Sequence, residues 1–146
     1  IEFDLPTMAR ELVALTRYQI PPEIELDFIG PAQLPCRLPE GRLRQSLLNL
    51  ILNSAQVLGR SPGRIRIEAM RDGDRVALTV TDDGPGFSTE MLETGIRPFA
   101  TGRPGGTGLG LAMVQRFIRE LGGQLSLSNA EPHGARVRML LPACCG

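Results

Sequence analysis

The sequence predicts an α+β fold, a two-layer α/β sandwich in which three long helices cover one face of a mixed, mostly antiparallel sheet. Apolar and polar side chains alternate over Arg64–Met70 and Val76–Thr81, and the turn Asp72–Gly73 joins these expected strands into a hairpin. Residues 125–127 and 135–141 predict a second hairpin. Three further segments repeat apolar residues at the spacing of helices that bury one face.

Length and composition indicate one domain over residues 1–146, large enough to bury its own core. The 16 basic residues balance the 16 acidic ones, so charge gives no reason to expect nucleic acid or an anionic membrane as a partner. No apolar run is long enough to span a membrane, and we expect no signal peptide. Three cysteines without metal-ligand spacing favour a reducing, cytoplasmic setting. Because the sequence starts at Ile1 rather than Met, we expect a fragment of a longer protein.

The first part of the chain predicts a helix and two extended pieces. Residues 1–5 form either a short strand or the end of a linker, and Pro6 suits the first position of a helix that runs to Tyr18. The expected apolar stripe of this helix is Met8, Leu12 and Leu15. Pro21–Pro22 ends it. Residues 24–28 alternate apolar and acidic side chains like a half-exposed strand, and a short extended piece follows around residues 36–38.

Two longer helices are expected further along. The first runs over residues 41–58 and is closed by Gly59. The second runs over residues 107–121, follows a loop at residues 96–106, and is followed by Gly122–Gly123. Residues 89–93 suggest one more helical turn. The expected apolar residues of the last long helix are Leu109, Met113, Val114, Phe117, Ile118 and Leu121.

Two asparagines form a polar stripe on the helix over residues 41–58. Its apolar face consists of Leu43, Leu47, Leu50, Ile51, Ser54 and Leu58. Asn49 and Asn53 are four residues apart, so they stack along its flank. Amide oxygens are hard neutral ligands that suit Mg²⁺ when phosphates supply the negative charge. The alternative is that both side chains only cap loops or bond each other.

Asp82 is an acid at the end of an expected strand. Strand periodicity puts it on the face of Val76, Leu78 and Val80, towards the helices, and puts Asp83 on the other face. A carboxylate in such a place needs hydrogen-bond donors, and the exocyclic amino group of adenine is one. Gly84 and Gly86 follow and leave backbone room for a flat ligand. The alternative is a plain turn in which Asp82 bonds local N–H groups.

A glycine-rich segment opens the last long helix. Gly105, Gly106, Gly108 and Gly110 fall within six residues, and backbone N–H groups at such a helix start bind anions. The sequence has neither a P-loop nor a dinucleotide-binding fingerprint, and it lacks the protein-kinase motifs. The single histidine, His133, is expected at the surface.

These pieces, in this order, resemble the ATP-binding domain shared by gyrase, the heat-shock chaperone ATPases, the MutL mismatch-repair proteins and the sensor histidine kinases, which has the Bergerat fold. Residues 47–55, LLNLILNSA, resemble the N box, and residues 82–87, DDGPGF, resemble the G1 box. Residues 98–103, PFATGR, are similar to the F box and ATP lid, and residues 106–112, GTGLGLA, to the G2 box. Gly134 stands where a third glycine motif begins the last strand.

The resemblance implies a role for each matching residue. Asn53 would hold Mg²⁺, Asn49 would support the metal or the phosphates of ATP, and Asp82 would accept from the adenine amino group. Gly84 and Gly86 would make room for the base. Thr101 and Arg103 would act in the lid, Arg103 towards the β- and γ-phosphates. The phosphate contacts would come from Gly106, Thr107, Gly108, Leu109 and Gly110. No role is implied for Ser128 or Asn129.

One position favours phosphoryl transfer over hydrolysis. ATP-hydrolysing members carry a glutamate four residues before the metal-binding asparagine, and here that residue is Asn49. The pattern is that of sensor histidine kinases, most like the nitrogen-sensor type. The alternatives are a gyrase- or MutL-type ATPase domain and a degenerate interaction module that no longer binds nucleotide. Gln56, Val57 and Ile96 depart from the residues common in relatives.

The resemblance also implies partners. The acceptor histidine would lie on a dimerisation and phosphotransfer domain upstream of Ile1, and residues 1–5 would be the end of the linker from it. The receiver domain of a response regulator would take the phosphoryl group next. The fragment would be monomeric and the full kinase a homodimer, cytoplasmic or anchored in a membrane.

Overall fold

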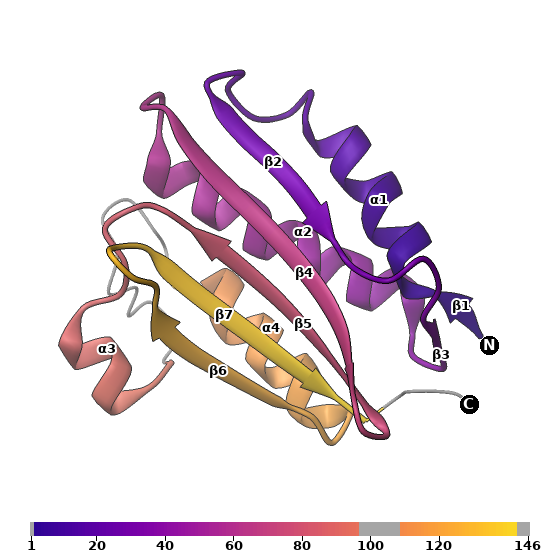
Figure 1. Ribbon diagram of the computed structural model, residues 1–146. Coiled ribbons are helices and arrows are strands. Elements are labelled where there is room, and N and C mark those ends of the chain that lie inside the picture. Colours follow the sequence, from indigo (N-terminus) through magenta and orange to yellow (C-terminus); the bar gives the residue numbers. More distant parts are fainter. Residues whose placement is uncertain (1, 97–108, 143–146) are drawn as a thin grey trace.

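Five strands form the main sheet of the computed structural model, which describes residues 2–96 and 109–142 (Figure 1). They are β2 (Ile24–Ile29), β4 (Gly63–Asp72), β5 (Arg75–Asp82), β6 (Gln124–Asn129) and β7 (Ala135–Leu141). Their order across the sheet is β2-β4-β5-β7-β6. The pair β2–β4 is parallel, and the three other pairs are antiparallel. The prediction of a mixed, mostly antiparallel sheet is confirmed.

Three long helices, α1 (Leu5–Thr16), α2 (Glu40–Leu58) and α4 (Leu109–Glu120), lie on one face of this sheet (Figure 1). A fourth, short helix, α3 (Thr89–Thr94), stands to the side near the end of β6. The opposite face carries no helix within the described residues. The two-layer sandwich is therefore confirmed, and the helical turn expected at residues 89–93 is α3.

The N-terminal residues are part of the domain. β1 (Phe3–Asp4) pairs antiparallel with β3 (Pro35–Cys36), so the short-strand alternative holds for residues 3–4. Asp4 then caps α1 through Thr7, and its other carboxylate oxygen accepts from the Leu34 N–H at 2.6 Å. Leu5 is fully buried at the start of α1.

The expected stripe of α1 is wrong at Leu15, whose side chain is 61% exposed. The buried residues are Leu5, Pro6, Met8, Ala9, Leu12, Val13 and Thr16. Most of these follow the three- and four-residue spacing of a single helical face, and Leu15 lies off that face. Thr16 is accommodated in the core because its hydroxyl donates to the Leu12 carbonyl at 2.6 Å.

The stripe of α2 is confirmed, since all six of its expected residues are buried. Gly59 follows α2 with a φ of 62°, a conformation that favours glycine. In α4 the expectation is wrong at Met113, which is 65% exposed. Val114, Phe117 and Ile118 are buried in the core as expected, and Leu111, which was not among the expected residues, is buried with them.

The first hairpin turns one residue later than expected. Asp72 pairs with Arg75, so the two turn residues are Gly73, with a φ of 66°, and Asp74. Within the described residues, no helix has the length and apolar character needed to cross a membrane.

Candidate functional site

Asp82 ends β5 with its side chain towards the helices, as the alternation predicts. Val76, Leu78 and Val80 are at most 2% exposed on the same face, and Asp82 is equally buried at 2%. Asp83 lies on the outer face, where its Oδ1 accepts from the Arg64 N–H at 2.8 Å. The strand therefore delivers one carboxylate into the layer between sheet and helices.

Donors from three segments of the described chain surround the Asp82 carboxylate. The Ser54 hydroxyl donates to Oδ2 at 2.7 Å, the Gly84 N–H donates to Oδ1 at 2.9 Å, and the Ala135 N–H donates to Oδ1 at 3.3 Å. The Gly84 bond is the local turn contact considered as the alternative, and the other two join segments far apart in the sequence. These bonds offset the cost of burying the charge and fix the direction of the carboxylate.

The bond from Ser54 joins the helix α2 to the end of β5. Asn53 precedes Ser54 on α2 and is half-buried, as is Asn49. The Gln45 amide donates to Asn49 Oδ1 at 3.0 Å, so the two asparagines do not simply bond each other. Within the part of the chain that the structure describes, Asn53 has no side-chain hydrogen-bond partner. Asn53 is therefore the neighbour, on α2, of the residue that bonds Asp82.

The loop after β5 carries Gly84 and Gly86, both buried. Gly86 has a φ of 84°, so the turn requires a residue that tolerates the left-handed region. Phe87 closes the loop and is 4% exposed. Ser88 then caps α3 through the Met91 N–H.

The turn between β6 and β7 lies against the backbone of Asp82. A Cβ atom built on Gly134 would lie 1.9 Å from the Asp82 carbonyl oxygen, so only glycine permits this approach. His133 is exposed as expected, and its Nδ1 also lies 3.3 Å from the Gly84 carbonyl oxygen. The close approach gives a physical reason for the glycine at position 134.

Asn129, at the end of β6, is a contact of this region that sequence reasoning missed. Its side-chain amide bonds both backbone groups of Phe87. No local pattern marks it, because its partner lies 42 residues away in the sequence.

The remaining predicted site residues fall mainly in the glycine-rich segment and the lid. Thr101, Arg103, Gly106, Thr107 and Gly108 lie outside the described residues, as does Phe99. Leu109 is the first residue of α4 and Gly110 the second, and Gly110 is half-buried. The described part of the predicted helix over residues 107–121 therefore runs from Leu109 to Glu120.

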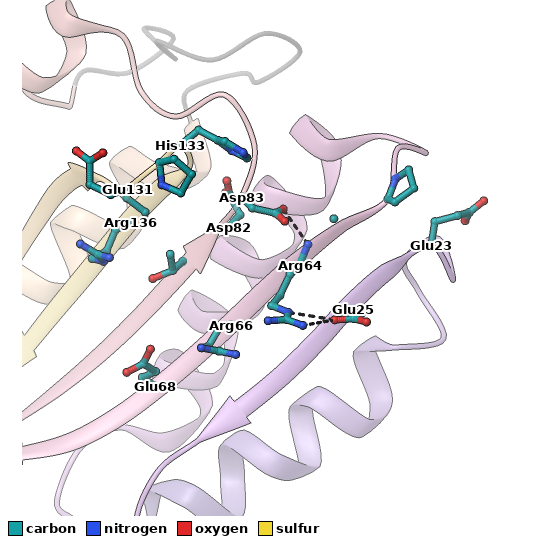
Figure 2. Close-up of a pocket in the computed structure, with 15 residues that line it drawn as sticks. Glu23, Glu25, Arg64, Arg66, Glu68, Asp82, Asp83, Glu131, His133 and Arg136 are labelled. Atoms are coloured by element: carbon teal, nitrogen blue, oxygen red, sulfur yellow. Dashed lines mark hydrogen bonds and ion pairs between the residues drawn. The ribbon is translucent and has the colours of Figure 1, made fainter.

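A cavity of about 660 Å³ opens on the helix-free face of the sheet (Figure 2). It is lined by charged side chains of both signs from the strands and by the residues before Gly134. Arg64 bonds Glu25 at 2.8 Å there, and this hydrogen bond and the negative charge of Glu25 raise the pKa of Arg64. Neither Asn49 nor Asn53 lines it. This cavity therefore does not include the asparagine stripe on α2, although Asp82 is among the residues that line it.

The chemistry of the donor set fits a nucleotide with a divalent metal. Asp82 offers a directed acceptor, which suits an amino group of a base. The described residues contain no group of three or more His, Cys, Asp or Glu side chains able to hold a metal. The neutral amide oxygens of Asn49 and Asn53 fit Mg²⁺ only when phosphate oxygens complete its ligands.

Comparison with known proteins points to one family. Residues 39–144 match the family described as histidine kinase-, DNA gyrase B-, and HSP90-like ATPase. The chain is 42% identical over 122 residues to the sensor histidine kinase ZraS of Salmonella typhimurium, covering 82% of this chain and 26% of that protein. It is 34% identical over 147 residues to the nitrogen regulation protein NtrY of Azorhizobium caulinodans, covering 96% of this chain and 19% of that protein.

The fold agrees with solved kinase domains. The catalytic domain of histidine kinase ThkA is 29% identical with a TM-score of 0.86, covering 97% of this chain and 94% of that one. ThkA has also been solved in complex with the response regulator protein TrrA. The chain spans about a quarter or less of the length of ZraS and NtrY. It belongs to the family of histidine kinase-, DNA gyrase B- and HSP90-like ATPases, and the relatives that it resembles are sensor histidine kinases.

Proposed function

We propose that this chain is the ATP-binding catalytic domain of a sensor histidine kinase, most like the nitrogen-sensor type. It binds Mg-ATP and donates the γ-phosphoryl group to a histidine on a separate dimerisation domain. The observation that carries the proposal is the bond between Ser54 and the buried Asp82, which links the N box to the G1 box. The similarity to ZraS and NtrY supports the kinase rather than another activity of the family.

Asp82 recognises the base in this proposal. The Ser54 hydroxyl and the Gly84 and Ala135 N–H groups hold its carboxylate in one orientation. A carboxylate fixed in this way accepts a hydrogen bond from the amino group of adenine, whereas the carbonyl oxygen at the same position of guanine offers no proton. Gly84 and Gly86 leave the backbone close to the plane of the base.

Asn53 and Asn49 act at the phosphates. Asn53 holds Mg²⁺ through its amide oxygen, and Asn49, oriented by Gln45, supports the metal or the phosphates. When bound there, Mg²⁺ would supply neutralisation of the charge on the phosphate oxygens. Thr101 and Arg103 of the lid and the G2 residues Gly106, Thr107, Gly108, Leu109 and Gly110 supply the other phosphate contacts.

The absence of a carboxylate beside Asn53 favours transfer over hydrolysis. The sequence of α2 has no acidic residue after Glu40, so α2 presents no general base to activate water next to the γ-phosphate. In the transfer, the bond from the γ-phosphorus to the bridging oxygen breaks, a bond to the histidine nitrogen forms, and ADP leaves. The protein contributes positioning and charge neutralisation.

Two partners follow from this function. The phosphoacceptor histidine lies on the dimerisation domain of the same kinase, which makes the full kinase a homodimer. A response regulator then receives the phosphoryl group, and the complex of ThkA with TrrA supports a partner of this kind.

The first test is nucleotide binding by the chain itself. Titration with a fluorescent ATP analogue is expected to show saturable binding that strengthens with Mg²⁺. Asp82→Asn weakens binding about tenfold or more, because the amide presents a donor or a neutral acceptor to the adenine amino group. Asn53→Ala removes the dependence on Mg²⁺. No saturable binding by the wild type would leave only a degenerate interaction module, and wild-type behaviour of both variants would refute the assigned roles.

The second test separates a kinase from an ATPase. The chain is mixed with the dimerisation hairpin of a related histidine kinase and ATP labelled in the γ-phosphate. We expect label on the hairpin, none on this chain, and slow hydrolysis in its absence. Fast steady-state hydrolysis by the chain alone, without transfer, would favour a gyrase- or MutL-type ATPase instead.

A further inference from the structure

We propose that Asn129 is a positioning residue of the nucleotide site, which holds the loop between Asp82 and Phe87 in its binding conformation. The proposal rests on the proposed binding of ATP. Asn129 lies at the end of β6, and neither the sequence motifs nor the proposed chemistry gives it a role.

Asn129 holds Phe87 by both backbone groups. The Phe87 N–H donates to Asn129 Oδ1 at 2.8 Å, and Asn129 Nδ2 donates to the Phe87 carbonyl oxygen at 3.0 Å. A side-chain amide used in this way makes the two backbone hydrogen bonds that a residue of a neighbouring strand would make with Phe87. Since β6 is an edge strand, the amide extends the sheet to a segment that forms no strand of its own.

The geometry also links Asn129 to Gly86. A Cβ atom built on Gly86 would lie 2.8 Å from Asn129 Oδ1 and 3.0 Å from the Gly134 carbonyl oxygen. The amide therefore passes directly over the second glycine of the G1 box. This contact explains why the loop needs glycine at position 86 beyond its positive φ.

The loop has separate anchors at its two ends. At the start, Asp82 is held by Ser54, Gly84 and Ala135. At the other end, the side-chain amide of Asn129 bonds the backbone N–H and the carbonyl oxygen of Phe87. The segment between them contains two glycines, which are costly to order. Asn129 thus fixes the shape of the wall that faces the base before the ligand arrives, and preorganisation of this kind strengthens binding.

The test compares Asn129→Ala and Asn129→Asp with the control Ser128→Ala. Ser128 is the preceding residue of β6, is exposed, and pairs with Arg136 on the outer face. ATP affinity is measured by calorimetry in Mg²⁺ and Tm by thermal unfolding. Hydrogen exchange of the Phe87 amide reports directly on the contact between Asn129 and Phe87, because this N–H is the donor to Asn129 Oδ1.

For Asn129→Ala we expect a rise in the Kd for ATP of about tenfold, the equivalent of one to two net hydrogen bonds. The Phe87 amide exchanges faster while the amides of β5 keep their protection. Asn129→Asp keeps an acceptor for the Phe87 N–H but replaces the donor to the Phe87 carbonyl by a charged oxygen that repels it, so its Phe87 amide stays protected while its Kd still rises. Ser128→Ala leaves Kd and exchange at wild-type values.

An unchanged Kd in a folded Asn129→Ala protein would overturn the proposal, as would faster exchange spread evenly over the domain. If Asn129→Ala does not fold, Asn129→Asp decides through the Kd: a raised Kd with a protected Phe87 amide supports the proposal, and an unchanged Kd overturns it. Failure of the wild type to bind ATP would refute the proposed function instead. In that case, exchange of the Phe87 amide still reports whether Asn129 orders the loop.

Discussion

Replacing Gly134 by alanine places a methyl group where the turn between β6 and β7 touches the backbone of Asp82. The added Cβ would lie 1.9 Å from the Asp82 carbonyl oxygen, 3.0 Å from its carbonyl carbon and 3.1 Å from the Asp83 Cα. All three are backbone atoms, so no side-chain rotation relieves the overlap. The two segments must separate by about 1.5 Å to reach ordinary van der Waals contact.

The cost of Gly134→Ala follows from three contributions. The φ of 126° at this position strains any residue with a side chain by about 1–3 kcal/mol. Separation also stretches the bond from the Ala135 N–H to Asp82 Oδ1 and the bond from the Ala130 N–H to the Gly134 carbonyl, at about 0.5–1.5 kcal/mol each. We therefore expect the free energy of unfolding to fall by about 3–5 kcal/mol, a large share of the stability of a typical domain.

Urea unfolding of Gly134→Ala and of the control Gly73→Ala tests this reasoning. Gly73 also has a positive φ, 66°, but a Cβ there meets nothing within 4 Å. The control therefore carries backbone strain without the clash, and we expect it to lose about 1–2 kcal/mol. Equal destabilisation of the two variants would refute the close approach as the reason for glycine at position 134. ATP affinity should fall in Gly134→Ala alone, because the clash displaces the Asp82 carboxylate.

Two further predictions concern buried and capping acids. Ser54→Ala leaves the buried Asp82 without its hydroxyl donor at 2.7 Å, so urea unfolding should show a loss of about 1.5–3 kcal/mol, and a loss below about 0.5 kcal/mol would contradict the role of this bond. Burial raises the pKa of Asp4, but the hydrogen bonds from Thr7 and Leu34 and the charge of Arg10 outweigh it and lower the pKa below its usual value. The stabilisation is present above the unfolded pKa, about 4, and is lost as the pH falls through the lower folded pKa. Asp4→Asn keeps an N-cap side chain but should remove this acid-dependent part of the unfolding curve, and an identical pH profile would count against the assignment.

The sequence was sufficient to predict burial wherever the helical or strand periodicity of a short segment decides which way a side chain points. The alternation along residues 76–82 placed Asp82 towards the helices, and the spacing of α2 gave its buried face correctly. The order of the glycine and asparagine motifs was enough to predict the family. The helical spacing wrongly predicted that Leu15 and Met113 are buried, because an apolar residue beside a helical stripe is buried only if a neighbouring element reaches it.

By itself, the sequence determined the type and order of the elements and the inward carboxylate, because each follows from spacing within a short stretch of chain, and the resemblance of its motifs, taken in order, indicated the family. Only the tertiary structure decided what those residues meet. It brought Ser54 to Asp82, Asn129 to Phe87, and Gly134 against the Asp82 backbone. Each of these contacts joins segments at least 28 residues apart, and no local period carries information about such a distance.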